Sequence, residues 1–155
     1  MPPAAPEPWH EVADALEYGP ACPQPGFPDK TSEDCLFLNV WTPSSGDAAR
    51  RPVLVYVHGG AYSSGSSSNA LYDGAQLARR GDVVVVTLNH RLNAFGYLYL
   101  DRSLRRAELA DSGNCGQLDL VLALQWVRDN IAAFGGNPDC VLAFGQSGGG
   151  AKIAT

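Results

Sequence analysis

The apolar stretch at residues 82–89, DVVVVTLN, limits the possible folds more than any other part of the chain. It has the length of a strand, and between its polar ends every side chain but that of Thr87 is apolar, so both faces of the strand must be covered. Strands of this kind occur in sheets that are sandwiched between helices, and such sheets are mostly parallel. The rest of the sequence can therefore be searched for further strands that alternate with helices.

Such an alternation is present. We expect strands at residues 35–42, 52–58 and 140–144, helices at 71–81 and 117–136, and a last helix that begins near Gly149. Apolar residues recur in the long helix at Leu118, Leu122, Leu124, Trp126, Val127 and Ile131. Their spacings of three and four predict a helix that is buried over a wide arc. The sequence thus predicts an α/β fold with a mostly parallel sheet and flanking helices.

One domain is expected over residues 1–155. Its first part, residues 1–34, holds eight of the eleven prolines, which predicts an irregular lead-in. A composition of 45% apolar and 17% charged residues suits a folded chain with a substantial core. The longest apolar runs are the length of strands, so no membrane span is predicted. The start, MPPAAPEPW, does not resemble a signal peptide, and both a cytoplasmic and a secreted location stay open.

Charge and cysteine content argue against several classes of partner. The net charge is −5 and no cluster of Lys and Arg exceeds a pair, which argues against a nucleic acid or an anionic membrane. The histidines are scattered and no Cys-x-x-Cys pair occurs, so we predict no zinc site. Cys115 and Cys140 are expected to be small buried hydrophobes. The sequence does not indicate an oligomeric state.

The glycine-rich stretch VLAFGQSGGGAK, at residues 141–152, could bind a phosphate or hold up a nucleophile. A P-loop needs Gly-x-x-x-x-Gly-Lys-Ser/Thr, because the lysine reaches the phosphates and the hydroxyl holds magnesium. Counted from Gly145, the second glycine falls correctly at Gly150, but Ala151 then takes the place of the lysine. Lys152 is one residue late, and Ile153, which has no hydroxyl, follows it. No nucleotide cofactor, and no other cofactor, is therefore expected.

The alternative, a nucleophile elbow, requires Gly-x-Ser-x-Gly between a strand and a helix. Residues 145–149, GQSGG, fit this pattern with Ser147 at its centre. An esterase also needs backbone N–H groups that stabilise the oxyanion, from the residue after the nucleophile and from a glycine-rich loop after an earlier strand. The residues HGGA, at 58–61, supply such a loop directly after the strand at 52–58. The two loops together predict a serine nucleophile with an oxyanion hole.

Five motifs carry a resemblance to a known family. They are SEDCLFLNVWTP (residues 32–43), VYVHGGAYSSGSS (55–67), VTLNHRLNAFGYL (86–98), GNCGQLDLVLALQWVRDNIAAFGGNPD (113–139) and FGQSGGG (144–150). With these motifs in the family's order, the chain resembles the type-B carboxylesterases of the α/β-hydrolase superfamily. The resemblance implies a partial α/β-hydrolase fold, incomplete at both ends, and hydrolysis of small carboxylic esters.

The resemblance also implies roles for individual residues. Ser147 would be the nucleophile that forms the acyl-enzyme, and the N–H groups of Gly60, Ala61 and Gly148 would form the oxyanion hole. The family's usual elbow is Gly-Glu-Ser-Ala-Gly, so Gln146 and Gly148 are departures from it. Gly148 still has the N–H that the oxyanion hole requires.

Two structural pairs follow from the same resemblance. Cys22 and Cys35 flank the segment PQPGFPDKTSED and match the cysteines of the family's first disulfide loop. Arg91 and Asp119 match a buried arginine–carboxylate pair, which we interpret as structural.

The remaining members of a catalytic triad are not expected within these residues. In this superfamily the acid and the histidine follow the serine, but only eight residues follow Ser147. His10, His58 and His90 all precede it, and His58 belongs to the oxyanion loop, which makes it a poor base. We therefore expect negligible turnover from residues 1–155 alone and an exposed apolar edge on the strand before the elbow. A catalytically inactive fragment and a non-catalytic, carboxylesterase-like binding protein stay open as alternatives.

Overall fold

The computed structural model describes residues 1–8, 10–11, 13–28 and 30–155. Its strands are β1 (Leu38–Trp41), β2 (Arg51–Val57), β3 (Val84–Leu88) and β4 (Gly136–Gly145). Its α-helices are α1 (Ala75–Gly81), α2 (Asn93–Tyr97), α3 (Asp101–Leu104), α4 (Cys115–Asn130) and α5 (Gly148–Ile153). Short 3-10 helices lie at η1 (Ala70–Tyr72), η2 (Ala107–Leu109), η3 (Ser112–Asn114) and η4 (Ile131–Phe134). Each strand and helix that the sequence predicted is present, but the helix predicted over 117–136 ends at Asn130 and is followed by η4 and β4.

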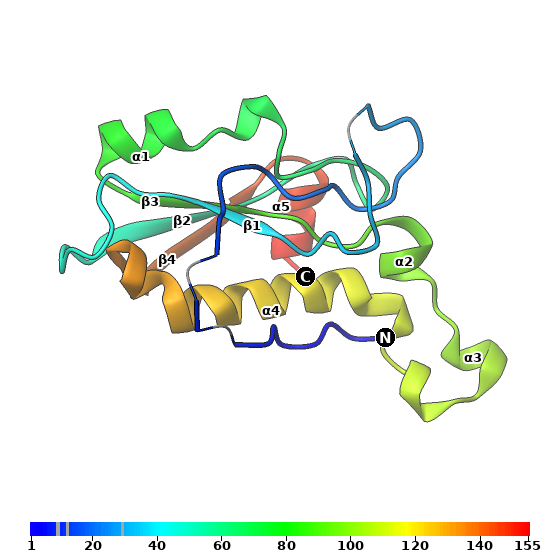
Figure 1. Cartoon of the computed structure of the whole chain (residues 1–155). Coiled ribbons are helices and arrows are strands. Elements are labelled where there is room, and N and C mark those ends of the chain that lie inside the picture. Colours follow the sequence, from blue (N-terminus) through cyan, green and yellow to red (C-terminus); the bar gives the residue numbers. More distant parts are fainter. Residues whose placement is uncertain (9, 12, 29) are drawn as a thin grey trace.

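The four strands form one mixed sheet in the order β1-β3-β2-β4. β2 pairs in parallel with β3 on one side and with β4 on the other, whereas β1 runs antiparallel to β3. Helix α1 lies on one face of the sheet and α4 on the other (Figure 1). The predicted α/β architecture with a mostly parallel sheet is therefore confirmed. Because β2, β3 and β4 are parallel, their carboxyl ends meet at one edge of the sheet.

The core lies between the sheet and α4. All five residues of β3 are buried, as its apolar run predicted. The core cluster consists of Val53, Val55, Val57, Val84, Val86, Leu88, Leu120, Val127 and Ile131. Leu124, which was expected to be buried, is 40% exposed. The prediction is therefore wrong for this residue, whereas Val127 and Ile131 are buried and Leu118, Leu122 and Trp126 are partly buried, as the wide arc predicted.

The outer strand β4 is open on one side. Nothing among the described residues pairs with it beyond β2, and Leu142 is 59% exposed. Val141 and Phe144 are also exposed, so the edge is apolar, as expected for the strand before the elbow. Cys140 is exposed as well. Its predicted burial is wrong because the outer strand of the sheet has no neighbour to cover it.

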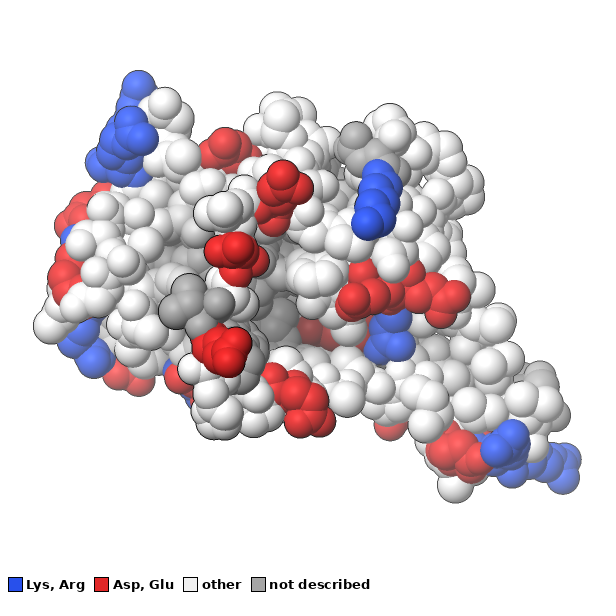
Figure 2. Space-filling view, viewed as in Figure 1, with Lys and Arg blue, Asp and Glu red and all other residues white. Residues whose placement is uncertain are grey.

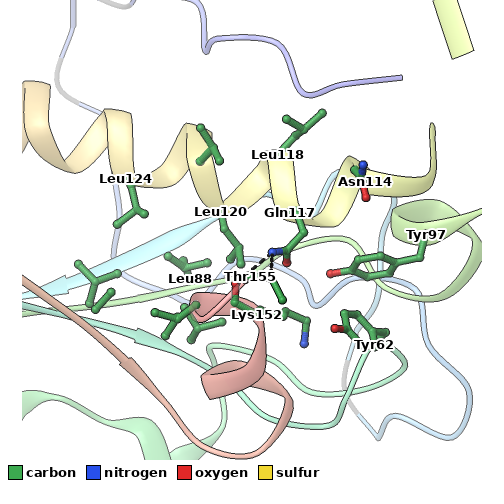
Figure 3. Close-up of a pocket in the computed structure, with 15 residues that line it drawn as sticks. Tyr62, Leu88, Tyr97, Asn114, Gln117, Leu118, Leu120, Leu124, Lys152 and Thr155 are labelled. Carbon is green, nitrogen blue, oxygen red and sulfur yellow. Dashed lines mark hydrogen bonds between the residues drawn. The ribbon is translucent and has the colours of Figure 1, made fainter. Parts of the chain in front are cut away.

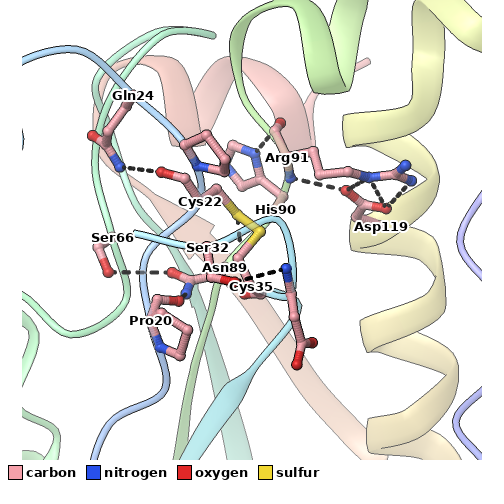
Figure 4. The surroundings of a disulfide bond; sticks show 12 residues. Pro20, Cys22, Gln24, Ser32, Cys35, Ser66, Asn89, His90, Arg91 and Asp119 are labelled. Atoms are coloured by element: carbon pink, nitrogen blue, oxygen red, sulfur yellow. Dashed lines mark hydrogen bonds and ion pairs between the residues drawn. A yellow bond between two sulfur atoms is a disulfide. The ribbon is translucent and has the colours of Figure 1, made fainter. Parts of the chain in front are cut away.

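The first 34 residues run along the molecule with little regular structure. Among their described residues, the one sheet-like contact is an isolated bridge between Ala21 and Thr31. Cys22 and Cys35 are joined in a disulfide with their Cα atoms 5.0 Å apart (Figure 4). Asp and Glu side chains are spread over the face in Figure 2, with Lys and Arg mainly towards its ends. No helix in the described part of the chain is long and apolar enough to cross a bilayer.

Candidate active site

The elbow lies where β4 ends and α5 begins. Only two residues, Gln146 and Ser147, separate Gly145 from the first residue of α5. Ser147 is exposed and has φ 54° and ψ −122°. A positive φ is a strained conformation for a residue with a Cβ, and such strain costs about 1–3 kcal/mol. The predicted sharp turn is therefore present, with the serine at its strained position.

The glycines of the elbow allow it to pass directly over the end of β2. A Cβ on Gly145 would lie 2.7 Å from the carbonyl oxygen of Val57. A Cβ on Gly149 would lie 2.8 Å from the carbonyl oxygen of His58, and closer still to that of Val57. These contacts involve backbone atoms, so no side chain can turn aside to make room. The close approach explains why Gly-x-Ser-x-Gly is required here.

The glycine-rich loop after β2 meets the start of α5. Gly60 and Ala61 have positive φ values of 93° and 52°. A Cβ on Gly148 would lie 2.6 Å from the nitrogen of Ala61, so the two backbones are in direct contact. None of the N–H groups of Gly60, Ala61 and Gly148 donates a hydrogen bond to another described residue. The structure thus brings together the two segments that were predicted to supply oxyanion donors, and it leaves these N–H groups unpaired.

His58, the first residue of this loop, stacks on His90 with the ring centroids 4.6 Å apart. Both are almost completely buried. One ring nitrogen of each, Nδ1, lies near a backbone carbonyl, 2.8 Å from that of Gly59 and 3.2 Å from that of Arg91. Nε2 of His90 is buried without a partner in the described chain. The sequence showed these histidines as scattered, but the fold places two of them together.

Burial disfavours protonation of both histidines. Burial lowers the pKa of His58, with Lys152 adding to the effect. Burial, together with the neighbouring His58 and Lys152, lowers the pKa of His90 to about 3. In the unfolded chain a histidine titrates at about 6.5. The ring of His90 therefore stays uncharged in the fold at a pH where the unfolded chain begins to protonate it, and the pKa of His58 is shifted in the same direction.

We expect this pair to make the fold sensitive to mild acid. Between pH 7 and pH 5 the unfolded state gains protons that folded His90 does not accept, so stability falls as the pH falls. His90 alone should contribute a loss of about 2 kcal/mol over this interval. His90→Phe should reduce this dependence in urea denaturation measured at each pH, whereas His10→Phe, at an exposed site, should not. An unchanged dependence in His90→Phe would contradict the assignment.

Arg91 and Asp119 tie the end of β3 to α4. Nη2 and Nε of Arg91 donate to the carboxylate at 2.6 Å and 2.9 Å, and the backbone N–H of Arg91 donates to it at 2.9 Å (Figure 4). The carboxylate side chain is only 1% exposed. It raises the pKa of the Arg91 guanidinium, chiefly through their hydrogen bonds. The pair therefore holds the loop after β3 on the helix, consistent with the structural role expected for it.

The whole chain matches one known protein family. The model of the carboxylesterase family matches residues 1–155. The chain belongs to the carboxylesterase family. Over the part of the solved carboxylesterases that it matches, this carboxylesterase chain has their α/β-hydrolase fold.

Relatives of the carboxylesterase chain include bacterial and animal enzymes. It is 48% identical to a para-nitrobenzyl esterase of Bacillus subtilis (strain 168), covering 98% of this chain and 32% of that protein. It is 46% identical to an acetylcholinesterase of Electrophorus electricus, covering 98% of this chain and 25% of that protein. A crystal structure of a carboxylesterase from Geobacillus stearothermophilus matches with a TM-score of 0.93 and 49% identity, covering 98% of this chain and 31% of that one. The carboxylesterase chain thus spans about a third or less of the length of these relatives.

One residue beside the site was missed by the sequence analysis. Lys152, considered there only as misplaced for a P-loop, is 2% exposed in α5 of the carboxylesterase chain and lies next to Ala61 and Gly148. Its place as the fifth residue after Ser147, inside a short helix of small residues, was the available signal. No group of three or more metal-ligating side chains occurs in the part of the chain that the structure describes.

Proposed function

We propose that this chain carries the nucleophile and the oxyanion hole of a serine esterase that hydrolyses small carboxylic esters. The observation that carries the proposal is the meeting of two segments: Ser147 stands exposed on a strained turn, and the unpaired N–H groups of Gly60, Ala61 and Gly148 lie where that turn meets the loop after β2. The esterase names of the relatives support the substrate class.

The proposed reaction begins with attack of the Ser147 hydroxyl oxygen on the ester carbonyl carbon, while a base removes the hydroxyl proton. The carbonyl oxygen becomes an oxyanion, which the three N–H groups stabilise. Collapse of this intermediate expels the alcohol, which takes up a proton, and leaves an acyl-serine. Water then attacks the acyl group by the same route and releases the carboxylic acid.

The base of this reaction is proposed to come from outside residues 1–155. The hydroxyl of Ser147 has no hydrogen-bond partner among the described residues, and His58 and His90 are buried with one ring nitrogen near a backbone carbonyl. A serine needs a nearby histidine, oriented by a carboxylate, to become a strong nucleophile. Residues 1–155 by themselves should therefore react slowly.

Labelling with a fluorophosphonate tests the proposal. In the protein expressed from its whole open reading frame, the probe should modify Ser147, as located by mass spectrometry, and Ser147→Ala should abolish both labelling and hydrolysis of a short aryl ester. Ser45→Ala, at an exposed serine away from the site, should retain both. Absence of label on Ser147 would favour a non-catalytic binding protein instead. Rapid ester hydrolysis by residues 1–155 alone would contradict the external base.

A further inference from the structure

Lys152 is a buried cation with no carboxylate partner in the described chain. Its ammonium group donates to the carbonyl oxygen of Ala61 and, at 3.3 Å, to that of Gly148. It also lies 4.8 Å from the ring centroid of Tyr62 (Figure 3). Two carbonyl dipoles and one aromatic face therefore replace the water and the counterion that a lysine usually has.

This environment would be unfavourable for a lysine side chain whose only role was to fill space. Burial of an ammonium group without an opposite charge is costly, and an apolar side chain of similar length would occupy the same volume without that cost. Burial accordingly lowers the pKa of Lys152. Groups whose pKa is shifted by burial in this way are concentrated at functional sites.

The two carbonyls that accept from Lys152 belong to the two segments of the proposed oxyanion hole. Ala61 is in the loop after β2, and Gly148 is the first residue of α5. These segments are far apart in the sequence, and each is held in place by its own strand. A single ammonium group bonded to both fixes the distance and orientation of one relative to the other.

We propose that Lys152 is a positioning residue that holds the N–H groups of Ala61 and Gly148 at the spacing an oxyanion requires. The inference rests on the proposed function and adds to it a residue that determines the geometry of the hole. The groups that face Lys152 are Tyr62 from the loop and the two histidines after β2 and β3, with Tyr97 of α2 packed against Tyr62. None of them is a carboxylate, so the ammonium group of Lys152 interacts mainly with the backbone carbonyls.

A positioning role predicts a specific kinetic change. The oxyanion hole is occupied fully only when the carbonyl oxygen becomes negative, so a disordered hole lowers kcat and leaves KM nearly unchanged. Lys152→Met keeps a long unbranched side chain, one heavy atom shorter, and removes the donors. In the protein from its whole open reading frame, we expect a loss in kcat of about 30-fold with KM within about twofold.

A transition-state analogue separates positioning from general packing. A trifluoromethyl ketone forms a hemiketal anion on the serine, so Lys152→Met should weaken its binding by about the same factor as kcat/KM. Lys30→Met, the matched control, removes an exposed ammonium and should change neither value. Equal kcat and analogue affinity in folded Lys152→Met and wild type would overturn the proposal, as would a rise in KM alone.

A second variant covers the case in which Lys152→Met does not fold. Lys152→Arg keeps a cation and donors, and a folded Arg variant that is labelled by the fluorophosphonate at more than a tenth of the wild-type rate would support positioning. A folded Arg variant labelled at less than a hundredth of that rate, or failure of both variants to fold, would overturn it. If the wild-type protein is not labelled at all, the proposed function itself fails, and this outcome is distinct from the others.

Discussion

Replacement of Asp119 by asparagine should lower the free energy of unfolding by about 3–5 kcal/mol. The side chain of Asp119 is 1% exposed and that of Arg91 is 18% exposed, so little solvent reaches the pair. Asparagine has nearly the same shape but no charge, and its amide would direct N–H groups towards a guanidinium that only donates. The cost is therefore that of an uncompensated buried cation together with lost hydrogen bonds, including the one from the backbone of Arg91.

The matched control is Asp139→Asn. Asp139 also pairs with an arginine, Arg50, at 2.9 Å, but its side chain is 81% exposed. Exposed pairs contribute about 0–1 kcal/mol, so this variant should unfold in urea at nearly the midpoint of the parent chain. Urea denaturation of the three proteins gives the comparison, with equal m-values as the check that the states are the same. A loss below about 1 kcal/mol for Asp119→Asn would contradict the structural role of the pair.

Replacement of Gly149 by alanine should damage both stability and reactivity. The added methyl group would lie 2.8 Å from the carbonyl carbon of Val57 and from the carbonyl oxygen of His58. Because the obstacles are backbone atoms at the end of β2, either that strand or α5 must move. We expect a loss of about 3 kcal/mol in the free energy of unfolding, at the upper end of the usual cost of overpacking.

The same displacement should affect the serine. Ser147 lies two residues from Gly149, and a shift of about 1 Å in a reacting group can reduce a rate by about 10²-fold. Fluorophosphonate labelling of Gly149→Ala should slow by at least this factor in the protein from its whole open reading frame. Gly81→Ala is the control, since a Cβ there meets nothing closer than 3.4 Å. Wild-type labelling in Gly149→Ala would show that the elbow tolerates the movement.

The sequence predicted well those elements whose local pattern is compatible with only one structure. The run of valines in β3 fits only a strand with both faces covered, and all five residues of β3 are buried. The register of the glycines around Ser147 is incompatible with a phosphate loop, and the strained φ of this residue agrees with an elbow. In both cases the steric requirement lies within a few consecutive residues.

Predictions that depended on distant parts of the chain succeeded less well. The burial of Cys140 and Leu124 could not be read from their spacing, because it depends on what lies beside β4 and α4. The antiparallel direction of β1 depends on the path of a loop and leaves no mark in an apolar pattern. The contact between Lys152 and Ala61 joins residues 91 positions apart, so no local motif could indicate it.

The serine stands at the end of a strand that has a hydrogen-bonded neighbour on one side only. Backbone amides that point outward from β4 should therefore exchange with deuterium quickly, in contrast to those of β3, which is paired on both sides. Any segment that adds to this open edge would slow the exchange and restrict the backbone just before residue 147. The reactivity of the Ser147 hydroxyl is then linked to whether another segment pairs with the open edge of β4. Deuterium exchange rates along β4 would measure that pairing directly.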